Sequence, residues 1–190
     1  MSPLRSAPAG RFLALAAGLS LALGLAGGAT AGGALHASAE LRGLDSAVVG
    51  WAGFTEDATG LLHVNVHVKG LSSGPHGIHI HAFGGPGACT PPFSAAGGHH
   101  NPLGALHGLL DPPGAHAGDL LNLELNVAGV GHLDATSDRA TISAGPTTIF
   151  DADGSALVIH ANEDDQVTNS GPLGPGNSGA RIACGIIEPD

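Results

Sequence analysis

Residues 62–69 read Leu-His-Val-Asn-Val-His-Val-Lys, and this strict alternation of apolar and polar side chains decides the fold class. A period of two residues is typical of a β-strand with one buried face. Residues 121–127 alternate in the same way, and residues 48–54, 139–143 and 156–160 are further strand candidates. No segment beyond the N-terminal apolar run has a helical period. Many short strands joined by glycine-rich turns predict an all-β fold, either a sandwich or a barrel.

The N-terminus has the features of a secretory signal peptide. Arg5 and Arg11 precede an uncharged apolar run over residues 12–26, and small residues follow, ending Ala29-Thr30-Ala31. The run is shorter than the ~20 residues that span a bilayer, and Ala-x-Ala is a typical cleavage site. We therefore expect residues 1–31 to be a signal peptide and residues 32–190 to be one exported domain. A retained N-terminal anchor is the alternative.

The charge and the cysteines narrow the choice of partners and compartment. Cleavage after Ala31 leaves 159 residues with four basic and sixteen acidic side chains, a formal net charge of −12. This charge argues against nucleic acid and anionic membranes as partners. Cys89 and Cys184 are the only cysteines, and in an exported protein an isolated pair favours a disulfide. A shared metal site is the rival interpretation of the two thiols.

Two stretches do not fit a strand. Residues 84–118 are rich in Gly, Pro and His, and residues 162–180 in Gly, Pro and acidic side chains. Loops of this length are uncommon in a compact domain unless they carry a function. We expect both to be functional loops.

The chemistry of the chain lies in its histidines. His79 and His81 alternate on one predicted strand, so both side chains point to the same face. His99, His107, His116 and Asp119 follow at intervals of eight, nine and three residues, and His160 ends a later strand. Three imidazoles and one carboxylate form a closed tetrahedral shell for a structural zinc, and imidazole also suits copper.

These residues, with the motifs at 77–84, 99–102 and 176–185, resemble the copper/zinc superoxide dismutase family, in its secreted bacterial branch. The resemblance covers roughly residues 35–188. It implies a Greek-key β-barrel or sandwich of about eight antiparallel strands with two long functional loops. The family motif here is His-x-Asn-Pro, so His99 is the expected ligand and His100 the variable position.

The resemblance also implies the cofactors, one copper and one zinc ion per chain. It assigns copper to His79, His81, His99 and His160. It assigns zinc to His99, His107, His116 and Asp119, with His99 bridging the two ions as an imidazolate.

The same resemblance implies the remaining roles and the reaction. Superoxide is converted to dioxygen and hydrogen peroxide by alternating reduction and oxidation of copper. Arg181 orients the anion, and His99 releases copper and takes up a proton in the reduced state. Asp164 connects His79 to His107, and Cys89 pairs with Cys184.

Two departures from the family pattern matter. Ala82 stands where the family often has Glu, and no Lys or Arg lies between His160 and Arg181 to guide the anion. We therefore expect activity with a modest dependence on salt. The other histidines are not assigned to metal; they are His36, His63, His67, His76, His100 and His132.

Two other functions compete with the enzyme. A non-catalytic protein of the same fold could bind or deliver copper, and a zinc-stabilised domain could serve a structural purpose. The complete ligand set and Arg181 favour the enzyme over both, and the zinc ligands disfavour a copper-only relative. We expect an exported bacterial protein, in the periplasm or outside the cell, that is a monomer or a homodimer and has no stable membrane partner after cleavage.

Overall fold

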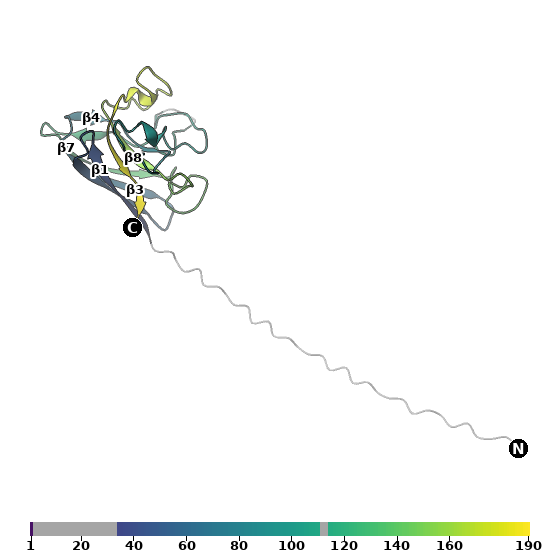
Figure 1. Ribbon diagram of the computed structural model, residues 1–190. Coiled ribbons are helices and arrows are strands. Elements are labelled where there is room, and N and C mark those ends of the chain that lie inside the picture. Colours follow the sequence, from purple (N-terminus) through teal and green to yellow (C-terminus); the bar gives the residue numbers. More distant parts are fainter. Residues whose placement is uncertain (2–33, 111–113) are drawn as a thin grey trace. The chain divides into compact units, whose positions relative to one another are not determined.

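The strands of the computed structural model form one antiparallel sheet that curls into a nearly closed barrel (Figure 1). The structure describes Met1 and residues 34–110 and 114–190, so the expected signal peptide over residues 1–31 lies outside the described part except for Met1. The ten strands are β1 (Leu35–Gly43), β2 (Val48–Glu56), β3 (Leu62–Lys69), β4 (Gly74–His76), β5 (Ile78–His81), β6 (Leu123–Leu125), β7 (Val130–Ser137), β8 (Ala156–His160), β9 (Arg181–Ile186) and β10 (Glu188–Pro189). The expected all-β class is confirmed.

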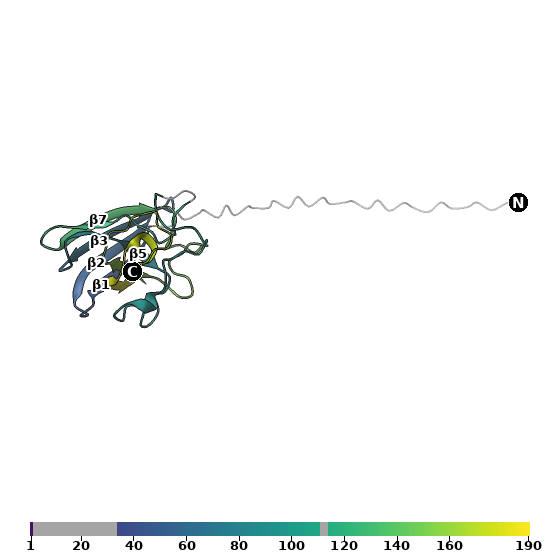
Figure 2. The same cartoon turned by 90° about the horizontal axis from the view of Figure 1, so that it is seen from above.

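The order of strands in the sheet explains how the barrel nearly closes. Neighbours run β4-β6-β7-β3-β2-β1-β9-β8-β5, and β10 pairs with β1. The central run β7-β3-β2-β1 is seen from above in Figure 2. The two end strands, β4 and β5, are consecutive in the chain and meet at Gly77. There Gly77 N–H donates to Asn162 O (2.7 Å) and His160 N–H donates to Gly77 O (2.8 Å).

The core follows from the alternation that predicts the strands. On β3, Leu62, Val64, Val66 and Val68 are buried while the intervening residues are exposed. Ile78 and Ile80 of β5 and Leu157 and Ile159 of β8 join the same apolar cluster. At roughly 25 cal/mol per Å² of buried apolar surface, this core is the main source of stability. It also fixes which way His79 and His81 point, because they alternate with the buried isoleucines.

Two strand predictions need correction. Residues 121–127 contribute only the short β6, over Leu123–Leu125. Residues 139–143 form no strand; an isolated bridge pairs Thr141 with Thr148. The reason is the buried carboxylate of Glu56, which accepts hydrogen bonds from the backbone N–H of Ile142 and of Ser143 and so takes donors that a strand would use.

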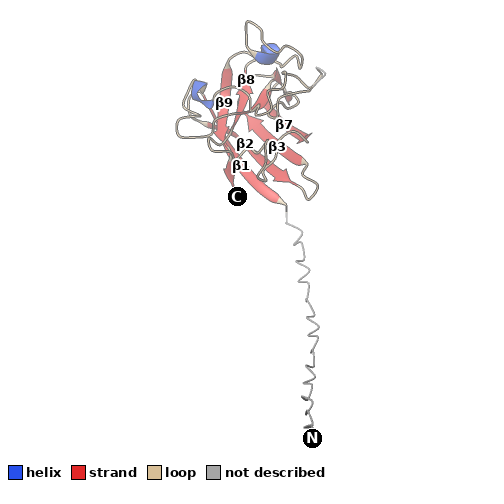
Figure 3. Ribbon diagram, turned by 90° about the vertical axis from the view of Figure 1, so that its right-hand side faces the viewer, coloured by secondary structure: helices blue, strands red, loops and turns tan. Residues whose placement is uncertain are grey.

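The two long loops carry the only helical segments of the described part, the 3₁₀ turns η1 (Ser94–Ala96) and η2 (Pro175–Asn177) (Figure 3). The loops run from the end of β5 to β6 and from the end of β8 to β9. Among the described helices, none is long and apolar enough to cross a membrane.

Candidate metal centre

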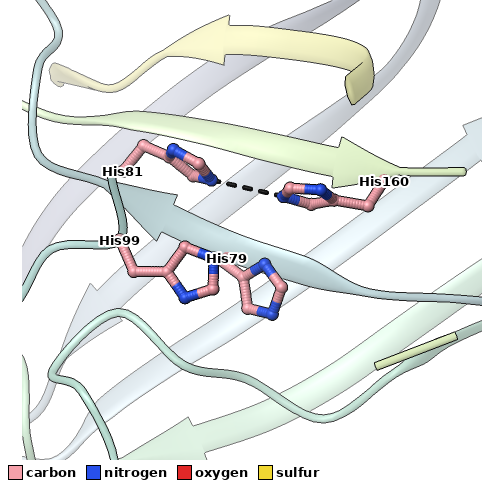
Figure 4. Close-up of side chains that lie close together, drawn as sticks. All are labelled: His79, His81, His99 and His160. Carbon is pink, nitrogen blue, oxygen red and sulfur yellow. Dashed lines mark hydrogen bonds between the residues drawn. The ribbon is translucent and has the colours of Figure 1, made fainter. Parts of the chain in front are cut away.

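Four histidines converge beside the antiparallel pair β5–β8, on the face turned away from the apolar core. His79 and His81 come from β5, His160 from the end of β8, and His99 from the first long loop, which forms a β-bridge with His81 (Figure 4). One nitrogen from each ring lies within 4.8 Å of the others. All four are buried or nearly so. Such a cluster is suited to a metal ion that prefers imidazole.

The hydrogen bonds of these rings show which nitrogen faces the cluster. His81 Nδ1–H donates to Gly97 O (2.9 Å) and His160 Nδ1–H donates to Gly179 O (3.1 Å). Each neutral ring then has its lone pair on Nε2. These two Nε2 atoms lie 3.3 Å apart (Figure 4). Two lone pairs directed at each other are repulsive unless a cation lies between them, so this geometry fits a bound metal.

A second set of donors gathers around Asp119. Its carboxylate lies close to three Nδ1 atoms, those of His99 (2.8 Å), His107 (3.1 Å) and His116 (3.3 Å). The structure thus brings together the four residues expected to hold zinc, with their ligand atoms within 4.8 Å of one another. His99 belongs to both sets. Its Nδ1 is turned to Asp119, which leaves Nε2 for the first set.

In the donor sets, two buried ring nitrogens make no aligned hydrogen bond with the described residues. They are Nδ1 of His79, in the first set, and Nδ1 of His107, in the second, which lies 3.1 Å from Asp119 Oδ2. A buried polar atom without a partner costs on the order of 1–3 kcal/mol. A metal ion in each set would ligate one of these atoms, so the orphaned nitrogens fit two metal sites rather than an ordinary polar core.

Asp164 connects the two sets from behind. His79 Nε2–H donates to Oδ2 (2.5 Å) and His107 Nε2–H donates to Oδ1 (3.0 Å). The backbone N–H of Gln166 also donates to Oδ1 (2.7 Å). The side chain of Asn122 donates through Nδ2 to Asp164 O and accepts through Oδ1 from Asp164 N–H. Gly176 packs against the carboxylate, where a Cβ would lie 2.1 Å from Oδ1. Asp164 therefore fixes the orientation of one histidine in each set.

The pKa shifts leave the first set neutral and keep the carboxylate of the second set ionised. Burial, then the neighbouring His99, lowers the pKa of His79 to about 3; burial also lowers that of His160 to about 4. These rings are therefore neutral at neutral pH, which is the form that binds metal. Burial alone would raise the pKa of Asp119, but hydrogen bonds from His107, His116 and His99 hold it well below its usual range. For His107, burial is outweighed by the neighbouring carboxylates of Asp119 and Asp164, and its pKa is raised to about 9. The environment of His107 thus favours positive charge.

Arg181 lies beside the first set. It pairs with His160 across β8 and β9, and its Nη1–H donates to Phe93 O (2.6 Å) while Nη2–H donates to Gly97 O. With Pro92, Ser94, Gly179 and Ala180, it lines a surface hollow of about 370 Å³. A half-buried guanidinium at such a hollow suits a small anion.

The expected disulfide is confirmed. Cys89 and Cys184 are bonded, with their Cα atoms 5.3 Å apart. The bond joins the first long loop to β9, the strand that carries Arg181. Ala88, Phe93 and Ala96 pack beside it against β8 and form a second small core. The loop that supplies both carbonyl partners of Arg181 is thereby tied to the barrel.

Sequence reasoning did not identify the backbone atoms and small residues that support the site. Gly97 O holds both His81 and Arg181, and Phe93 O holds Arg181. His76 is buried and donates through Nδ1 to the backbone carbonyl of His160 (2.7 Å). No pattern in the sequence signals a backbone acceptor. The ring of His100 lies 3.4 Å from Thr147 O through Nε2 and belongs to neither donor set.

Comparison with known proteins agrees with this geometry. The family model for copper/zinc superoxide dismutase (SODC) matches residues 48–187. Superoxide dismutase [Cu-Zn] 2 of Aquifex aeolicus is 40% identical over 157 residues, which cover 81% of this chain and 87% of the relative. Superoxide dismutase [Cu-Zn] of Caulobacter vibrioides is 38% identical over 155 residues, which cover 80% of this chain and 85% of the relative. Among solved structures, a SOD-like protein from Bacillus subtilis matches with a TM-score of 0.70 and 36% identity, covering 78% of this chain and 95% of that one.

Proposed function

The chain belongs to the copper/zinc superoxide dismutase family, and we propose that it is an exported enzyme that converts two superoxide anions and two protons to dioxygen and hydrogen peroxide. We assign copper to His79, His81, His99 and His160, and zinc to His99, His107, His116 and Asp119. The observation that carries the assignment is the shared ring of His99, which belongs to both four-donor clusters.

When bound, copper supplies one-electron transfer in both directions, since it alternates between two oxidation states, whereas zinc has no redox chemistry and supplies structure. The protein residues supply the rest. Arg181 has five N–H donors, and its bonds to Phe93 O and Gly97 O leave others free to orient the anion. Each peroxide formed consumes two protons. We assign one of them to Nε2 of His99, whose other ring nitrogen is held toward Asp119.

The experiment is a combined metal count and activity assay on the purified protein. We expect one copper and one zinc per chain and rapid dismutation. His160→Ala should lose copper and activity, whereas the control His63→Ala, an exposed histidine on β3, should retain both. Both metals bound without activity would indicate a copper carrier instead of an enzyme.

We also propose that residues 1–31 direct export to the periplasm or beyond and are removed. The basic start, apolar run and Ala29-Thr30-Ala31 support this, and the Cys89–Cys184 disulfide is suited to an oxidising compartment. Mass spectrometry of protein from the cell envelope and medium tests it. The mature chain should begin at Gly32; an intact N-terminus in the envelope fraction would indicate a retained anchor.

A further inference from the structure

A pair of histidines outside the metal centre faces solvent on the outer surface of the barrel. His67 of β3 and His132 of β7 are direct cross-strand partners. Both alternate with core residues, Val66 and Leu133, whose side chains point inward. Because successive side chains of a strand point to opposite faces, the pair lies on the outside of the sheet and takes no part in the metal centre.

The two imidazoles lie close together and are exposed. Their ring centroids are 5.9 Å apart and the rings are nearly parallel, with an interplanar angle of 19°. The His132 side chain is 65% exposed. Side chains at directly paired positions of an antiparallel sheet have Cβ atoms about 4.5–5.5 Å apart, which allows both rings to reach one ion by rotation about their side-chain bonds.

A carboxylate completes the group. Asp134 lies two residues after His132, on the same face of β7, and its Oδ2 is 3.8 Å from His132 Nε2. Asn65 of β3 donates to the other oxygen, Oδ1, which leaves Oδ2 turned toward the histidines. Lys69 lies on the same face of β3 and opposes a cation there, but the mature domain carries a formal net charge of −12.

Two imidazoles and a carboxylate at an exposed position, with room for water ligands, suit borderline divalent transition metals. The affinity of such a donor set for divalent ions is higher for Cu²⁺ than for Ni²⁺ and is lower again for Zn²⁺. We propose that His67, His132 and Asp134 form an auxiliary surface site for a divalent transition-metal ion, separate from the two donor sets beside β5 and β8. The competing interpretation is that the rings only stack and stabilise the sheet.

The chain has a built-in reporter for this site. Trp51 is the only tryptophan, it is 57% exposed, and on β2 it is the direct partner of His67. A paramagnetic ion such as Ni²⁺ bound at His67 would quench the indole fluorescence through proximity. Zn²⁺ has a filled d shell and would bind at the same place without paramagnetic quenching.

The test titrates Ni²⁺ into the protein already loaded with copper and zinc, with all three metals counted. We expect one additional nickel per chain, quenching of Trp51, and unchanged copper, zinc and dismutase activity. His67→Asn and His132→Asn should each weaken nickel binding at least about tenfold, because each removes one of two imidazole ligands. The matched control is His63→Asn, on the same face of β3, and should leave nickel binding unchanged.

Three results would overturn the proposal. They are the absence of bound nickel beyond the resident metals, nickel that appears only as counted zinc is displaced, and nickel binding that survives both His67→Asn and His132→Asn. Because these side chains are exposed, the variants should fold, and retained activity checks this. Asp134→Asn provides a milder second variant and should weaken binding less than loss of either histidine.

Discussion

At the scale of single residues, Asp164 couples the two donor sets. Its two carboxylate oxygens hold His79 of one set and His107 of the other, so the orientation of both rings depends on one side chain. Burial would raise its pKa, but hydrogen bonds from His107 and His79 hold the pKa well below the usual range. Asp164 is therefore ionised, and its two oxygens accept from both rings at once.

We predict that Asp164→Asn weakens zinc binding about 10- to 100-fold. His79 and His107 bond to different oxygens of Asp164, and an amide replaces one of these with an NH₂ donor, so one ring meets a donor and loses its fixed orientation. Competition with a chromophoric chelator measures the affinity. The control Glu163→Gln changes an exposed carboxylate next to it and should have little effect. Equal zinc affinity in Asp164→Asn and wild type would contradict the assigned role.

A second residue-scale prediction concerns Glu56, which is 6% exposed and lies away from the metals. Burial raises its pKa, but hydrogen bonds from Ser143 and Ile142 outweigh this and lower the pKa below the ordinary value. Because the pKa of Glu56 is lower in the folded protein than in the unfolded chain, the ionised carboxylate stabilises the fold. This stabilisation is fully present above the pKa of the unfolded chain and is lost as the pH falls through the pKa of the folded protein. Glu56→Gln should cost about 1.5–3 kcal/mol at pH 7.

Urea unfolding of metal-loaded wild type and Glu56→Gln at several pH values checks this. The difference between the two should shrink below about pH 4.5, where the unfolded carboxylate becomes protonated. The control is Glu124→Gln on the exposed face of β6. A stability difference that stays constant down to pH 3 would mean that the charge of Glu56 contributes nothing.

At the scale of elements, β3 is the strand that apolar alternation predicted best. Residues 62–69 show it, and β3 has the predicted bounds. β7 went unpredicted because Gly131 and the small residues Ala135 and Ser137 weaken its pattern. Residues 139–143 have the pattern of a strand but bind Glu56 from another part of the chain, and a local pattern carries no signal of such a distant partner.

In the candidate site, the side-chain donors could be predicted from the sequence, whereas the backbone acceptors could not. Six histidines and Asp119, at the family's spacing, predicted the seven donors of the two four-residue sets that the structure brings together. Asp164, which was also predicted, joins His79 and His107 in a third group. The carbonyls of Gly97 and Phe93 could not be predicted, because every residue has a carbonyl and only the folded loop decides which ones face Arg181. The pairing of His67 with His132 could not be predicted either, because it depends on the register of β3 against β7.

A prediction at this scale concerns the loop tied down by Cys89–Cys184. The bond closes a segment of 95 positions, and the chain-entropy model gives about 4–5 kcal/mol of stabilisation for such a loop. We expect the double variant Cys89→Ser, Cys184→Ser to lose about this much unfolding free energy. It should also lose activity, because the carbonyls that hold Arg181 are on the freed loop.

Guanidinium unfolding of the metal-loaded oxidised protein and the double variant measures the difference. Reduction of the wild-type protein is the matched comparison, since it opens the bond without changing the sequence. If the reduced protein and the double variant both match the oxidised protein in stability and activity, the disulfide does not hold the loop.

At the scale of the whole molecule, the charge distribution raises a question about substrate capture. Residues 32–190 are strongly acidic and the substrate is an anion, yet the loop between His160 and Arg181 contains no basic residue. That loop is held instead by internal hydrogen bonds, in which Asp165 accepts from Thr168 and Asn177. Arg181 is therefore the basic residue that lines the hollow beside the first set.

We therefore predict that the second-order rate constant of the loaded enzyme changes less than about threefold between about 10 and 150 mM salt, since no extended positive field is available to be screened. Glu163→Lys places a cation in the loop and should raise the low-salt rate several-fold, with the gain lost at high salt. Glu188→Lys makes the same change of charge on β10, at the opposite end of the barrel (Figure 1), and should have a smaller effect. Pulse radiolysis at graded ionic strength measures the rate constants of the wild type and of both variants. A steep fall in the wild-type rate with salt would reveal a steering surface elsewhere, and equal gains in both variants would show that only net charge matters.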